Sequence, residues 1–208
     1  MNIRLDYTNM MADVVGQEHG ISEQELKALL PRTEEIHRDL MASREAGSLP
    51  FYDLPFASAP VDEVLTLAGK IRQKFTTVVV LGIGGSALGT SALFRALSPL
   101  YHNLMGPKKA PGPRLLVLDN VDPAGFSEAL DQCDPKTTVF LVISKSGSTV
   151  ETMCQFLVAQ EWAKAAVGDS FRDHFVLVTD PVSGALRQLA DKEGYACLLY
   201  TSDAADEE

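Results

Sequence analysis

The sequence predicts an α/β protein: a three-layer α-β-α sandwich with a mainly parallel sheet, preceded by N-terminal helices. The main observation is that short runs rich in Val, Leu and Ile recur from residue 77 onwards, at 77–81, 114–118, 138–143 and 175–179. Strands of a parallel sheet are buried on both faces and therefore read as continuous apolar runs. The segments between these runs have helical character, and helices between parallel strands supply right-handed crossovers that cover the sheet.

The first long element is a helix. Residues 22–44 carry apolar side chains at helical spacing, and Ser22 with Glu25 three positions later forms a capping-box pattern at its start. Pro31 lies inside this segment, and we expect it to break or restart the helix because proline lacks the backbone N–H.

The chain divides into a helical lead, residues 1–60, and an α/β body, residues 61–196. An amphipathic helix over residues 61–74 opens the body. A fifth strand should begin near Ala196, but the following letters, CLLYTSDAADEE, resemble a translated sequencing-library adapter. We expect residues 197–208 to be a non-native tail, the sheet to lack a complete fifth strand, and the chain to be a fragment. A natural acidic tail is the alternative.

Composition excludes several classes of protein. Hydrophobic residues make up 46% and charged residues 22% of the chain, and no apolar run has the roughly 18 residues that span a bilayer. The start lacks the pattern of a signal peptide, so we expect a cytoplasmic protein without membrane partners. A net charge of −10 argues against nucleic acid as a partner. Three cysteines without CxxC spacing and four dispersed histidines predict neither a metal site nor a disulfide framework. We expect no cofactor.

Two turns between a predicted strand and a predicted helix carry the candidate site. They are residues 82–86 and 144–149. Such a turn directs backbone N–H groups at one point, at the positive end of the helix dipole, which attracts an anion. The second turn adds the hydroxyls of Ser144, Ser146, Ser148 and Thr149 and the ammonium group of Lys145. Short hydroxyl donors satisfy the acceptor oxygens of a phosphate ester, so these turns predict a phosphate and sugar pocket.

Other interpretations of these residues are weaker. The hydroxyls could be simple helix N-caps, but capping needs one such residue and the turn has four. The glycine turn invites comparison with a dinucleotide site, yet Ala87 stands where the third glycine of that motif belongs, and no acidic residue follows at the required distance. The loop 107–113 contains Lys108 and Lys109; we expect a solvent loop, with a second anion site as the alternative.

The segments VVVLGIGGSALG and, some sixty residues later, VISKSGSTVET resemble the glucose-6-phosphate isomerase family in its N-terminal sugar-isomerase (SIS) domain. The resemblance implies a SIS-type fold for residues 61–196, incomplete at its C-terminal end, and interconversion of glucose 6-phosphate and fructose 6-phosphate through a cis-enediol. It also implies a homodimer for the full-length protein. The alternatives are a non-catalytic phosphosugar-binding SIS module and an isomerase acting on another sugar phosphate.

The resemblance also assigns roles to individual residues. The substrate-binding residues would be Gly85, Ser86, Ser144, Lys145, Ser146, Gly147, Ser148 and Thr149. The first two would contact the open-chain sugar, and the turn 144–149 would hold the phosphate. The family's catalytic base, its ring-opening histidine and its cationic groups follow the point where this chain stops. We therefore expect this chain alone to bind substrate without catalysing the isomerisation.

Overall fold

The computed structural model describes residues 4–56, 59–106 and 109–199. The chain forms two compact units, Met1–Tyr52 and Asp53–Glu208. Within the described part of the chain, no helix has both the length and the apolar character needed to cross a membrane.

The first unit is helical. It contains the 3₁₀ helix η1 (Thr8–Met10), α1 (Ala12–Val15), α2 (Glu23–Glu45) and η2 (Pro50–Tyr52). Helix α2 begins with the predicted capping box: the Glu25 N–H donates to the Ser22 hydroxyl, and the Glu25 carboxylate accepts from the Ser22 N–H. This arrangement satisfies N–H groups that the first turn of a helix leaves without partners.

The expected break at Pro31 is wrong, because α2 runs without interruption from Glu23 to Glu45. Proline removes one backbone hydrogen bond, but strong helix formers flank it on both sides. Two polar contacts accompany it in the same part of the helix. Thr33 donates its hydroxyl to the Leu29 carbonyl, and Arg32 pairs with Glu35 at 2.6 Å.

The second unit is a parallel α/β structure. Its elements are η3 (Leu54–Phe56), α3 (Ala59–Lys74), β1 (Thr77–Leu81), α4 (Gly85–Leu97), η4 (His102–Leu104), β2 (Arg114–Leu118), α5 (Pro123–Asp131), β3 (Thr138–Ile143), α6 (Val150–Val167), η5 (Gly168–His174), β4 (Phe175–Thr179), α7 (Ala185–Glu193) and β5 (Ala196–Leu199). The strand order is β2-β1-β3-β4-β5, and every pairing is parallel. All four predicted strands are confirmed, with the predicted bounds.

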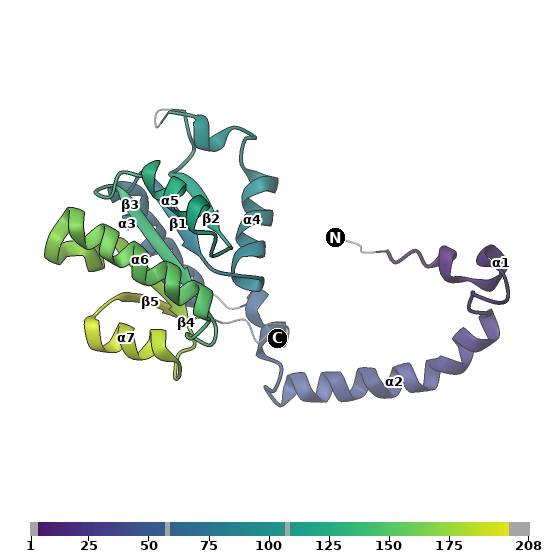
Figure 1. The fold of residues 1–208 in the computed structure, drawn as a ribbon. Helices are drawn as coiled ribbons and strands as arrows, with labels where there is room; N and C mark the ends of the chain where they lie inside the picture. Colours follow the sequence, from purple (N-terminus) through teal and green to yellow (C-terminus); the bar gives the residue numbers. More distant parts are fainter. Residues whose placement is uncertain (1–3, 57–58, 107–108, 200–208) are drawn as a thin grey trace. The chain divides into compact units, whose positions relative to one another are not determined.

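Two apolar clusters hold helices α3, α5, α6 and α7 to the sheet. The larger one joins alternate residues of the central strands, such as Phe140 and Leu177, to α5, α6 and α7. The smaller one packs the opposite face, around Val78 and Val139, against Leu67 and Ile71 of α3. Figure 1 shows α6 and α7 on one side of the strands and α3 on the other. The predicted three-layer sandwich is confirmed.

The edge of the sheet next to β4 differs from the expectation. Ala196–Leu199 form β5, which pairs with β4 in register Val176 opposite Ala196. Cys197 packs against the larger apolar cluster and Leu198 against the smaller one. These two residues alternate between the faces of the sheet as a strand requires, so the sheet has a fifth strand where an incomplete edge was expected. Residues 200–208 of the expected tail lie outside the described residues, and its origin stays a prediction.

Candidate functional site

Three turns meet at the carboxyl ends of neighbouring strands. We call residues 82–86 after β1 the glycine turn, residues 144–149 after β3 the serine turn, and residues 180–184 after β4 the aspartate turn. In the sheet Leu81 pairs with Val142, so the glycine and serine turns start side by side. A Cβ atom on Gly82 would lie 3.2 Å from the Ile143 carbonyl oxygen. Open α/β sheets bind their ligands at this end of the strands.

Hydroxyl groups organise the serine turn from within. Ser144 is only 2% exposed, and its Oγ lies 3.0 Å from the Oγ1 of Thr149. The Gly147 N–H donates to the same Ser144 oxygen at 3.2 Å. Ser146 and Ser148 are exposed, and the Ser148 hydroxyl donates to Ser146 Oγ at 3.2 Å. The turn therefore has a buried hydroxyl at its base and two hydroxyls at its surface.

Helix α6 opens onto this turn without a side-chain cap. Thr149 is its N-cap residue, yet the Thr149 hydroxyl makes no capping bond and points to Ser144 instead. Helix α4 likewise starts after Gly84, a residue at φ +57° that has no side chain to cap with. At the start of α5, by contrast, the Asp122 carboxylate accepts from the Gly125 N–H at 2.8 Å. The N-terminal ends of α4 and α6 thus both offer positive dipole ends at the site.

The aspartate turn and the start of α7 clamp the serine turn through backbone contacts. The Asp180 N–H donates to the Lys145 carbonyl at 3.3 Å, and the Leu186 N–H donates to the Gly147 carbonyl at 3.1 Å. Gly184 has φ +95°, and a Cβ atom there would lie 2.3 Å from the Ser146 carbonyl oxygen. Only glycine allows this approach, since a side chain would collide with the turn. The serine turn is therefore fixed on its outer side.

Asp180, directly after β4, holds its own turn together and does not cap a helix. Its Oδ1 accepts from the N–H groups of Val182 and Ser183, each at 2.8 Å, and from the Ser183 hydroxyl. These backbone donors, with a smaller contribution from the Lys145 charge, lower the pKa of the Asp180 carboxyl below its ordinary value. An ionised carboxylate thus stabilises the loop that holds the serine turn.

The three turns contain no histidine. In the second unit, His102 Nε2 bonds the Pro113 carbonyl at 2.9 Å and His174 Nδ1 bonds the Thr138 carbonyl at 2.8 Å. Both histidines are buried, and both partners lie near the amino ends of strands. Within the described ranges, no group of three or more His, Cys, Asp or Glu side chains is placed to hold a metal ion.

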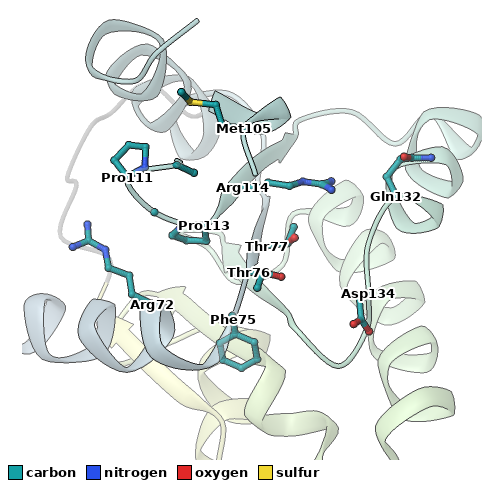
Figure 2. A pocket seen from close by; sticks show the side chains of 12 residues that line it. Arg72, Phe75, Thr76, Thr77, Met105, Pro111, Pro113, Arg114, Gln132 and Asp134 are labelled. Atoms are coloured by element: carbon teal, nitrogen blue, oxygen red, sulfur yellow. The ribbon is translucent and has the colours of Figure 1, made fainter. Parts of the chain in front are cut away.

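A separate cavity of about 590 Å³ lies at the amino ends of β1 and β2. Figure 2 shows Arg72 of α3 and Arg114 of β2 at different places on its wall, with Pro111 and Pro113 between them. Residues 107 and 108 of the proposed second anion loop lie outside the described residues. The cavity is at the sheet end opposite to the three turns, so it belongs to a different surface.

The structure brings the predicted residues Gly85 and Ser86 to the same sheet end as the serine turn. Sequence reasoning missed the contribution of the aspartate turn, above all Gly184. The only signal in the sequence was the turn-forming string Asp-Pro-Val-Ser-Gly directly after a predicted strand.

Comparison with known proteins shows which protein family this chain resembles. Residues 63–187 match the family described as phosphoglucose isomerase. A glucose-6-phosphate isomerase from Carboxydothermus hydrogenoformans is 36% identical over 195 residues, 93% of this chain and 42% of that protein. One from Rubrobacter xylanophilus is 36% identical over 95% of this chain and 44% of that protein. The chain thus spans less than half the length of these curated relatives.

Two solved structures are similar to this chain in both fold and sequence. A hypothetical protein from Thermus thermophilus superposes with a TM-score of 0.69 at 36% identity, covering 85% of this chain and 40% of that one. A glucose-6-phosphate isomerase from Chlamydia trachomatis gives a TM-score of 0.54 at 32% identity over 68% of this chain and 26% of that one.

Proposed function

Because this chain belongs to the phosphoglucose isomerase family, we propose that it is the phosphosugar-binding part of an isomerase that interconverts glucose 6-phosphate and fructose 6-phosphate. The observation that carries the proposal is the serine turn, which presents hydroxyls at the uncapped N-terminus of α6 and is clamped next to the glycine turn. The similarity of full-length glucose-6-phosphate isomerases to this chain supports the choice of substrate.

The phosphate would bind at the serine turn. A phosphate dianion has three acceptor oxygens, and the exposed hydroxyls of Ser146 and Ser148 lie where the α6 dipole is positive. Lys145, half-buried beside them, adds a positive charge in a chain of net charge −10. Ser144, Gly147 and Thr149 would shape the turn and contribute the remaining donors.

The sugar would extend from the phosphate toward the glycine turn. Gly85 and Ser86 start α4 next to the serine turn, and Gly85 has no side chain to exclude a ligand. Ser86 is 8% exposed, so only a small part of its side chain would be open to contact with an open-chain sugar. Donors on two neighbouring turns would therefore orient the substrate at both ends.

Isomerisation needs catalytic groups as well as a correctly oriented substrate. A base must remove the proton from C2 and return it to C1 through a cis-enediol, an acid must open the ring, and a cation must stabilise the enediolate. Neither histidine of the second unit lies in the three turns. We infer that this chain binds and positions the phosphosugar but does not turn it over, and that a full-length relative of it works in the cytoplasm as a homodimer.

The test is isothermal titration calorimetry of the 208-residue chain with glucose 6-phosphate, inorganic phosphate and glucose. We expect binding of the first two and none of glucose, because the phosphate supplies the recognised charge. Lys145→Ala should weaken binding at least tenfold, whereas Lys136→Ala, an exposed lysine before β3 at the other end of the sheet, should leave it unchanged. Equal binding of glucose and glucose 6-phosphate would contradict the proposal. Turnover of fructose 6-phosphate by the pure chain would contradict the predicted inactivity.

A further inference from the structure

The turn that follows β2 begins in the same row as the turns of the site, and we call its residues 119–122 the β2 turn. Leu118, the last residue of β2, pairs with Leu81 of β1, and Leu81 in turn pairs with Val142 of β3. The glycine turn therefore lies between the β2 turn and the serine turn, at the same end of the sheet. Neighbouring strands are about 4.8 Å apart, so the serine turn and the β2 turn start about 10 Å from each other.

One buried side chain joins the β2 turn to helix α6. Gln155 is 3% exposed, and its Nε2 donates to the Asn120 carbonyl at 2.7 Å and to the Leu118 carbonyl at 3.3 Å. Gln155 follows Thr149, the N-cap of α6, by six residues, which corresponds to about 9 Å along a helix. The first turns of α6 therefore connect the β2 turn to the serine turn.

Filling of the core does not account for Gln155. Among the described residues, its Oε1 is buried and accepts no hydrogen bond. A buried acceptor without a partner destabilises a fold, and an apolar side chain of similar size would avoid that cost. Departures from such rules are expected at functional sites. What Gln155 contributes as a polar residue is the pair of hydrogen bonds that fixes the path of the β2 turn.

The other end of the β2 turn is fixed by Asp122, whose carboxylate accepts from the Gly125 N–H. Asp119 and Asn120 lie between these two attachments. Within the described part of the chain, their side chains form no hydrogen bond or ion pair. A carboxylate accepts hydrogen bonds, and an amide both accepts and donates them, so the two side chains together match the hydroxyls of a sugar.

We propose that the β2 turn binds the sugar hydroxyls farthest from the phosphate, with Asp119 and Asn120 as specificity-determining residues and Gln155 as the positioning residue that holds the turn in place. The ligand is a polyhydroxylated chain whose phosphate lies at the serine turn. An open-chain hexose phosphate extended across the glycine turn has the length needed to reach the β2 turn, about 10 Å away. The choice of ligand rests on the proposed function, whereas the attachment of the β2 turn to α6 does not.

The experiment measures the affinities of the 208-residue chain for glucose 6-phosphate and for inorganic phosphate by calorimetry. In Asp119→Ala/Asn120→Ala we expect the affinity for glucose 6-phosphate to fall about fivefold or more, since hydrogen bonds to the sugar are lost, while the affinity for phosphate is unchanged. Gln155→Met keeps the length of the side chain but removes its donor, and should act in the same way. The matched control is Gln160→Met, because Gln160 also donates from α6, to the Tyr195 hydroxyl, and should leave both affinities unchanged.

Two results would overturn the proposal. One is an equal fall of both affinities, because the β2 turn would then act only through the phosphate site. The other is an unchanged affinity for glucose 6-phosphate in Asp119→Ala/Asn120→Ala, a variant whose folding is checked by circular dichroism. If the unaltered chain bound neither ligand, the proposed function would fail, and this proposal with it.

Hydrogen exchange tests the positioning role separately. Without ligand, the amides of residues 119–122 should exchange about fivefold faster in Gln155→Met than in the unaltered chain, and at the unaltered rate in Gln160→Met. Glucose 6-phosphate should slow their exchange in the unaltered chain and inorganic phosphate should not, a difference that a merely structural role of Gln155 would not produce. Equal exchange in the three ligand-free chains would show that Gln155 does not hold the turn, and equal protection by both ligands would contradict sugar binding there.

Discussion

The clamp on the serine turn makes Gly184→Ala the most informative single substitution. The new Cβ atom would lie 2.3 Å from the Ser146 carbonyl oxygen, whereas ordinary contacts begin at 3.4 Å. Relieving the collision moves the serine turn or the aspartate turn by roughly 1 Å, and a displacement of that size can cost about 10²-fold where donors must meet a ligand. We expect the affinity for glucose 6-phosphate to fall at least tenfold.

The effect on stability can be separated from the effect on binding. Gly184→Ala should cost about 1–3 kcal/mol for the unfavourable backbone conformation and about 1–3 kcal/mol for overpacking. Gly168→Ala is the matched control, because Gly168 also has a positive φ, +61°, but nothing lies within 4 Å of a Cβ atom there. Only the backbone cost applies to the control, and its affinity should match that of the unaltered chain.

The assay combines urea unfolding with calorimetry using glucose 6-phosphate, on both variants at the same pH. A folded Gly184→Ala protein with unaltered affinity would refute the reasoning. So would equal losses of affinity in the two variants, since the control changes no contact with the serine turn.

Three further predictions concern the scaffold. The pKa of Asp180 in the folded chain is lower than its ordinary value of 3.8. Ionised Asp180 therefore stabilises the fold at pH values above 3.8, and this contribution is lost as the pH falls through the folded-state pKa. Thermal unfolding of Asp180→Asn and of the unaltered chain should therefore differ most near neutral pH and converge in acid; a constant difference would contradict this. Leu177→Ala, at a fully buried site of β4, should cost about 2–5 kcal/mol in urea unfolding, against less than about 0.5 kcal/mol for Leu157→Ala on the exposed side of α6. Ser22→Ala removes the cap of α2 and should cost about 1 kcal/mol, visible as faster hydrogen exchange in the first turn of that helix; unchanged exchange there would show that the cap is not needed.

The strands could be predicted because each is a continuous apolar run bounded by polar or turn-forming residues. The burial of the inner strands follows from that pattern, as at Val80 of β1 and Leu177 of β4, which are fully buried, whereas the edge strand β2 is half-buried. The capping box of α2 could be predicted for a similar reason, since Ser22 and Glu25 interact within one turn. Local patterns decide local structure.

Contacts between distant segments could not be predicted in this way. The close approach of Gly184 to Ser146 depends on how β3 and β4 pair, and the glycine alone reads as an ordinary turn residue. The continuity of α2 through Pro31 shows the opposite error, in which a local rule predicts a break that the surrounding helix formers prevent. Strand β5 formed because Cys197 and Leu198 fit both faces of the sheet, whatever the origin of that segment.

The hydrogen bond from the Leu186 N–H to the Gly147 carbonyl has a consequence for how the site arises during synthesis. The serine turn emerges from the ribosome complete, with all its hydroxyls, about forty residues before the segment that fixes it. Until β4 has paired with β3 and α7 has started, the chain contains the residues of the serine turn but not the hydrogen bonds that fix their arrangement. Phosphate affinity would therefore appear late, after Leu186 is in place, and could serve as a reporter of the moment when this sheet end closes during folding.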